Sequence, residues 1–203
     1  MIKCNVTICG TISRDASVRT GKDGKEFVNF PLCVSISDRN GNGGSLDISI
    51  SKDGGQDEAD GFRNGSRAKV TGTLVLKRRG EKLYFNLSAD SVSFSDVGNM
   101  DSVNGQMTFR GKTGQHIEER KDKKGNPYLM FSAFSTEKVN DGFEYQWVRF
   151  FFFGKEKEEW LQPGVKVDVK GQMSLSLYDG KPGISCRVEE LNQYVPDTGN
   201  ENR

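Results

Sequence analysis

Residues 146–156 alternate aromatic and cationic side chains in a pattern that suits chemistry on a surface. In an extended strand, successive side chains point to opposite faces. One face then carries only the apolar side chains of Val148, Phe150 and Phe152. The other face carries four rings around one guanidinium: Tyr145, Trp147, Arg149, Phe151 and Phe153. Because arginine is almost never fully buried without a partner, we predict that the second face is exposed.

An exposed face of rings around a cation supports two interpretations. Flat rings stack on bases and a guanidinium binds phosphate, which is how many proteins hold single-stranded nucleic acid. The same rings can instead pack against another subunit. These residues alone leave both interpretations open.

Residues with catalytic or metal-binding chemistry do not converge in the sequence. GKTG at Gly111–Gly114 imitates the end of a phosphate-binding loop, but Gln106 stands where that pattern needs glycine. His116 is the single histidine and has no cysteine partners for a metal. The acidic run near residue 156 suits a solvated helix better than a metal site: Glu156, Glu158 and Glu159. We therefore expect no enzyme activity, no metal and no other cofactor.

The composition favours a cytoplasmic all-β protein. The 203 residues allow one or two domains, and 24 glycines among short alternating runs indicate many tight turns. A net charge of +1 gives no global basic field, so nucleic acid would need a locally basic face. The first residues do not form a signal peptide, and no stretch approaches membrane-spanning length. Without metal spacing, the cysteines are expected to be reduced core or face residues: Cys4, Cys9, Cys33 and Cys186.

The strand patterns of the first hundred residues recur in the second hundred. Five strands are expected in the first set, starting with Ile2–Ile12, and Gln56–Phe62 predicts a short helix between the third and fourth. GNPYL from Gly125 echoes GKEFV from Gly24, and the run from Trp160 echoes the run from Gly61. We therefore expect a first barrel over residues 1–97, a linker over 98–104, a second barrel over 105–195 and a polar tail over 196–203.

Five strands with a short helix between strands three and four form the OB-fold pattern. Three motifs resemble the bacterial single-stranded DNA-binding proteins: GTISRDASVR from Gly10, GFRNGSRAKVTG from Gly61 and WVRFFFFGK from Trp147. Ala16 stands where that family has proline. The resemblance implies two tandem five-stranded OB-fold barrels, each with its helix, as in the tandem-barrel members of the family.

The family's binding residues carry over position by position. Base stacking falls on Trp147 and Phe153, and phosphate contacts fall on Arg149 and Lys155. The family's stacking ring at the far end of strand four falls on Tyr178. Its loop ring after strand two has no clean match. Phe134 is the substitute, on the outward parity of that strand with Tyr128, and Phe151 completes the face.

The resemblance implies binding and protection of single-stranded DNA in replication, recombination or repair. It also implies a homodimer that presents four barrels, with replication or repair proteins as partners. The acidic tail by which many members recruit repair enzymes has no counterpart in the final residues, VPDTGNENR. Two alternatives stay open: a protein-interaction module of a replication or DNA-transfer machine, and a single-stranded RNA binder.

The two halves are expected to contribute unequally. Matching Leu46, Ile48 and Ile50 with Val148, Phe150 and Phe152 aligns the two core faces. The ring positions of the second half are then polar in the first: Ser45, Asp47, Ser49 and Ser51. Arg79 stands where the second half has Tyr178, next to Lys77 and Arg78. We expect these three cations to contact phosphate, and the second half to supply most of the stacking.

Overall fold

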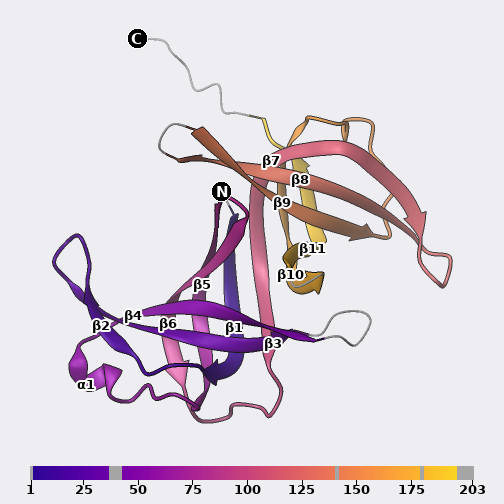
Figure 1. Ribbon diagram of the computed structural model, residues 1–203. Coiled ribbons are helices and arrows are strands. Elements are labelled where there is room, and N and C mark those ends of the chain that lie inside the picture. The colour runs from indigo at the N-terminus through magenta and orange to yellow at the C-terminus, as the bar shows by residue number, and fades with distance from the viewer. Residues whose placement is uncertain (1, 37–42, 140–141, 179–180, 196–203) are drawn as a thin grey trace.

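The computed structural model describes residues 2–36, 43–139, 142–178 and 181–195, which form strands and one short helix (Figure 1). The first half contains β1 Ile2–Ile12, β2 Ser17–Thr20, β3 Glu26–Ile36, β4 Gly44–Asp53, α1 Gln56–Ala59, β5 Arg67–Arg79 and β6 Lys82–Ser93. The second half contains β7 Ser102–Lys121, β8 Pro127–Val139, β9 Gly142–Phe153, β10 Lys166–Tyr178 and β11 Lys181–Gln193. The tail expected over residues 196–203 lies outside the described residues.

The strands of the second half close into a five-stranded barrel. β7 pairs with β8 and β8 with β9, both antiparallel. β9 pairs with β11 in parallel, and β11 returns through β10 to β7. A closed ring has no free sheet edge, so every strand keeps two neighbours. The expected all-β, OB-like class is confirmed.

The strands of the first half pair in the same order. β1 pairs with β3, β3 with β4, β4 with β6 in parallel, β6 with β5, and β5 with β1. The short strand β2 adds to the outer edge of β3 and was not foreseen from the sequence. The two halves also make the same backbone hydrogen bond at equivalent positions of β1 and β7. Gly65 N–H donates to Ile12 O, and Gly164 N–H donates to Thr113 O.

A glycine at the same place in each half allows two strands to approach closely. A Cβ atom at Gly72 would lie 2.1 Å from the carbonyl oxygen of Ser88, and one at Gly171 would lie 2.1 Å from that of Arg187. Each glycine also adjoins a register shift, in β5–β6 and in β10–β11. No other residue type fits without moving backbone, because only glycine lacks Cβ.

The two halves share a strand-to-strand contact. β1 pairs antiparallel with the first part of β7, from Ile2 opposite Phe109 to Cys9 opposite Ser102. This pairing joins the described strands into one eleven-stranded sheet, and β7 runs through both halves in Figure 1. The linker expected over residues 98–104 overlaps β7, since residues 102–104 already pair with β1.

The segment between β6 and β7 is fixed to the first half by Asp101. Its Oδ1 accepts a hydrogen bond from Arg67 at 2.7 Å, and its Oδ2 accepts one from the backbone N–H of Ser35 at 2.8 Å. Burial alone would raise the pKa of Asp101, but these hydrogen bonds and the Arg67 charge outweigh it and lower the pKa. Arg67 also donates to the carbonyl of Gly98.

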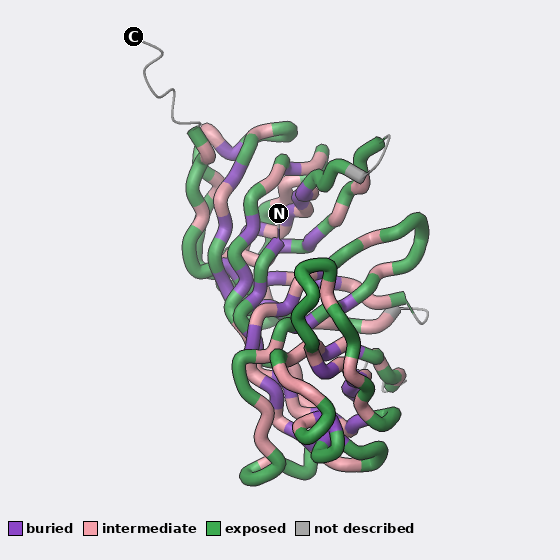
Figure 2. The backbone as a smooth tube through the Cα atoms, turned by 90° about the vertical axis from the view of Figure 1, so that its left-hand side faces the viewer, coloured by how far each residue is buried: buried purple, intermediate pink, exposed green. Residues whose placement is uncertain are grey.

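One continuous hydrophobic cluster fills both halves. Buried residues alternate with more exposed ones along the strands, as Figure 2 shows, which is the period-two pattern of half-buried sheets. The four cysteines are free, as expected. Burial raises the pKa of the Cys4 thiol and of the Cys186 thiol to about 12, so both are uncharged core residues.

The expected helix in each half is found in the first half only. α1 spans four residues of the predicted segment. Residues 154–165, between β9 and β10, form turns instead, so the predicted helix around Glu156, Glu158 and Glu159 is wrong. Its backbone hydrogen bonds are those of turns, from Leu161 N–H to the carbonyl of Glu158 and from Gln162 N–H to the carbonyl of Trp160. Pro163 stops any helix at Gln162. Thr113 holds this segment in place by donating a hydrogen bond to the carbonyl of Gln162 at 2.7 Å.

Candidate nucleic-acid interface

The predicted ring-bearing face of β9 is exposed, and its other face is buried. Val148 is 1% exposed and Phe150 is fully buried, whereas Trp147 is 48% and Phe153 is 42% exposed. Phe152, the third residue assigned to the inner face, is partly buried against the core. The alternation of β9 is therefore confirmed.

Strand β8 brings further rings to this face, because its even-numbered residues lie opposite the odd-numbered residues of β9. At one end Phe134 lies opposite Trp147, with ring centroids 4.9 Å apart, and contacts Tyr145 edge-on at 5.4 Å. We call Phe134, Tyr145 and Trp147 the Trp147 cluster. Gly114 of β7 lies against it, since a Cβ there would be 3.1 Å from the Trp147 ring.

At the other end of the face, Tyr128 lies opposite Phe153 and stacks on it, with centroids 5.2 Å apart and an interplanar angle of 25°. Tyr128 also contacts Phe151 at 6.5 Å. We call Tyr128, Phe151 and Phe153 the Phe153 cluster. Trp147 and Phe153 are six residues apart on one strand, about 20 Å at the rise of an extended chain. The face therefore offers two separate stacking platforms.

Cations lie between and beside the two clusters. Arg149 is exposed between them, opposite Ser132 of β8 and Ser185 of β11. Lys155 is exposed just beyond the Phe153 cluster. The guanidinium of Arg187 lies 5.2 Å above the Phe153 ring. Within the described part of the chain, none of these three cations forms an ion pair with a carboxylate.

Sequence reasoning missed two contributors to this face. Arg187 comes from β11, and its place beside Phe151 depends on the parallel pairing of β9 with β11, which the sequence does not display. Phe143, near the start of β9, is 60% exposed and has the same parity as Trp147, so the alternation could have indicated it.

The residues predicted to bind DNA lie at the end of β5 and at the end of β10, and those of β5 differ in exposure. Lys77 and Arg79 are exposed on β5. Arg78 is partly covered, and its Nε is buried with no hydrogen-bond partner among the described residues. The adjacent Gly80 N–H donates to Glu144 of β9 at 3.2 Å, so this hairpin touches the second half. Tyr178 ends β10, and its side chain lies outside the part that the structure describes.

The matching face of the first half is polar, as expected, but the residue-by-residue matching was wrong by two positions. Phe27 pairs with Asp53 as Tyr128 pairs with Phe153, so Trp147 and Arg149 correspond to Asp47 and Ser49. A period of two cannot distinguish alignments that differ by two residues, whereas cross-strand register does. Asn29 donates to Ser49 Oγ at 3.1 Å and Ser13 donates to Asp47 at 3.3 Å.

The described residues offer neither a cluster of metal ligands nor a membrane-spanning helix. Across the described ranges, no group of three or more His, Cys, Asp or Glu side chains is placed to hold a metal ion. None of the helical structure in those ranges has the length and hydrophobicity needed to cross a bilayer.

No family model matches the sequence, and no curated protein matches it. Among solved structures, the wild-type single-stranded DNA binding protein from Thermus aquaticus superposes with a TM-score of 0.50 at 15% identity, covering 100% of this chain and 97% of that one. A deletion mutant of the same protein gives a TM-score of 0.50 at 17% identity, covering 100% and 98%. The mitochondrial single-stranded DNA binding protein of S. cerevisiae covers 43% of this chain, at 23% identity and a TM-score of 0.35.

At 15–17% sequence identity, the structural similarity to the Thermus aquaticus protein establishes the fold alone. Over its whole length this chain has the fold of the Thermus aquaticus single-stranded DNA binding protein. The resemblance inferred from three short motifs is thus confirmed for the architecture.

Proposed function

We propose that this protein binds and protects single-stranded DNA without catalysing a reaction. The observation that carries the proposal is the outer face of β8 and β9, where two exposed ring clusters flank Arg149. Exposed rings next to unpaired cations are the means by which proteins bind single strands without reading sequence. The shared fold with a protein whose name states that it binds single-stranded DNA supports the same conclusion.

Most of the predicted residues take a definite role in this proposal. Bases stack on the Trp147 cluster and on the Phe153 cluster, while phosphates contact the cations between and beside them: Arg149, Lys155 and Arg187. In the first half, the exposed side chains of Lys77 and Arg79 attract the phosphate backbone of the DNA but do not stack on its bases. The site therefore accepts any base and depends on salt.

A salt-resolved fluorescence titration tests this function. Single-stranded DNA should quench Trp147 strongly, duplex DNA should bind much more weakly, and rising salt should reverse the quenching, because counterions compete for the phosphates. Equal or tighter binding of blunt duplex DNA at moderate salt would refute the proposal. An unchanged signal with every oligonucleotide would favour a protein-docking face, and a clear preference for RNA would favour an RNA-binding role.

We further propose that the two halves are duplicated OB-fold barrels, over residues 1–97 and 105–195, with residues 98–104 between them. The identical pairing order and the equivalent close approaches at Gly72 and Gly171 support this duplication. A cytoplasmic role in replication, recombination or repair follows from the proposed ligand, because these processes expose single strands.

We also propose that the protein forms a homodimer containing four barrels. Two barrels alone offer the DNA only a short binding path. The chain also repeats a unit that resembles members of a tetramer-forming family. Light scattering at micromolar concentration should give twice the mass of one chain. A monomer both with and without DNA would overturn this assembly.

A further inference from the structure

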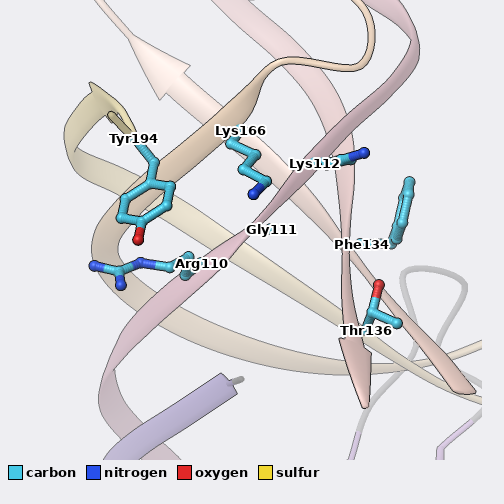
Figure 3. Close-up of a pocket in the computed structure, with 7 residues that line it drawn as sticks. All are labelled: Arg110, Gly111, Lys112, Phe134, Thr136, Lys166 and Tyr194. Carbon is cyan, nitrogen blue, oxygen red and sulfur yellow. The ribbon is translucent and has the colours of Figure 1, made fainter. Parts of the chain in front are cut away.

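A pocket of about 310 Å³ lies beside the Trp147 cluster, on the surface of β7, β8 and β10. Its lining consists of Arg110, Gly111, Lys112, Phe134, Thr136, Lys166 and Tyr194, all labelled in Figure 3. Phe134 belongs to both the pocket and the Trp147 cluster. The pocket therefore continues the stacking face onto β7 and the start of β10, where the motif comparison assigned no binding residue.

The strand registers place four side chains in one row across the sheet. Lys166 of β10 lies opposite Lys112 of β7, Lys112 lies opposite Phe134 of β8, and Phe134 lies opposite Trp147 of β9. Adjacent strands are about 4.8 Å apart, so the row spans about 14 Å. A chain stacked on Trp147 and Phe134 would meet the two lysines next.

The facing lysines are an unfavourable arrangement in the free protein. Like charges directly opposite each other on neighbouring strands destabilise a sheet. Both side chains are exposed, and no carboxylate among the described residues forms an ion pair with either. An anion held between Lys112 and Lys166 would remove this repulsion.

Two other polar side chains of the pocket, Arg110 and Tyr194, already have partners. Arg110 makes a two-pronged ion pair with Asp168, at 2.6 and 3.0 Å, and its guanidinium lies 4.1 Å from the centre of the Tyr194 ring. Tyr194 is also fixed by its backbone N–H, which donates to the carbonyl of Lys166 at 2.9 Å. Figure 3 shows the Lys166 side chain between Tyr194 and Lys112. Arg110 thus positions a ring. The Lys166 ammonium lies 5.8 Å from the centre of the same ring, and neither lysine has a carboxylate partner among the described residues.

We propose that this pocket binds one nucleotide of the DNA strand, with its phosphate between Lys112 and Lys166 and its base or sugar against Phe134 and Tyr194. This site rests on the proposed single-stranded DNA binding and extends the path from β9 towards β10. Thr136 supplies a hydroxyl at the pocket edge.

The test compares the parent with the double variant Lys112→Gln/Lys166→Gln. Loss of one phosphate contact should make the negative slope of log K against log salt shallower by about 0.7. At 0.1 M salt this change corresponds to about a fivefold loss of affinity. Quenching of Trp147 at saturation should stay unchanged, because its own stacking is untouched. The melting temperature without DNA should stay the same or rise, since the repulsion is gone. A melting temperature clearly lower than the parent's would contradict the repulsion on which the site is inferred.

Two controls make the result specific. Lys22→Gln/Lys25→Gln removes the same charge from an exposed turn of the first half and should leave affinity and slope near the parent values. Tyr194→Leu should also weaken binding while keeping the salt slope. If the parent binds but the pocket variant matches the turn control, the pocket assignment is wrong. If the parent itself does not bind, the proposed function fails instead.

Inorganic phosphate distinguishes a strand phosphate from a free one. At 1 mM, phosphate should reduce oligonucleotide binding no more than chloride at the same ionic strength. Displacement of the oligonucleotide by micromolar phosphate would assign the pocket to a free anion and overturn the proposal.

Discussion

Replacing Trp147 by alanine is expected to weaken binding of single-stranded DNA by about 5- to 150-fold, or about 1–3 kcal/mol, the range for one stacked base. The ring is half exposed, contacts Phe134 and lies against a glycine, so it is held in place while its outer surface stays free. Binding should be measured by fluorescence anisotropy of a labelled oligonucleotide, because the variant loses its own reporter.

Two controls accompany this variant, with folding of all three proteins checked by circular dichroism. Phe94→Ala removes an exposed ring of the first half that packs on Phe62, and should cost stability without changing affinity. Ser49→Ala alters the position that corresponds to Arg149 and should bind like the parent. If Trp147→Ala bound like the parent while Ser49→Ala abolished binding, the DNA face would be misassigned.

Gly171→Val is expected to destabilise the protein by about 3 kcal/mol, because overpacking at this site forces backbone apart rather than a flexible side chain. The added Cβ would sit 2.1 Å from the carbonyl oxygen of Arg187, on the strand that carries the cation above Phe153. For a chain of this size, the melting temperature should fall by about 6–12 °C in calorimetry.

Gly98→Ala is the matched control for this substitution. A Cβ at Gly98 meets no atom within 4 Å, and its backbone does not need the left-handed region, so its stability should stay near the parent value. Equal melting temperatures for the two variants would show that the close approach of β10 and β11 does not limit the side chain at 171.

Many strands could be predicted because apolar and polar side chains alternate clearly along this sequence. Ile2–Ile12 alternates cleanly, and β1 has the expected bounds. The inner and outer faces of β9 follow from the same rule. Turn glycines and the echo between Gly24 and Gly125 indicated that the two halves have the same strand order. These are local signals, and a local pattern is what a single sequence displays most directly.

The remaining features depend on register, which alternation does not encode. The offset between β4 and β9 was wrong by two because a period of two fits either alignment, and only the pairing of β4 with β3 and of β9 with β8 decides between them. Three cations lie beside the rings only through strand pairing: Arg187 through β11 with β9, Lys112 through β7 with β8, and Lys166 through β10 with β7. The second helix was expected only by analogy with α1, and the hydrogen bonds of that segment form turns instead.

The pairing of β1 with β7 has a consequence for how the two halves can differ. When two copies of one chain meet about a twofold axis, every substitution appears on both sides, and a residue that suits one surface is imposed on the other. Here the two partners of that contact belong to one polypeptide, so each side mutates alone. Asp47 can therefore stand in β4 while Trp147 stands in β9, so that the two halves present different surfaces at equivalent positions.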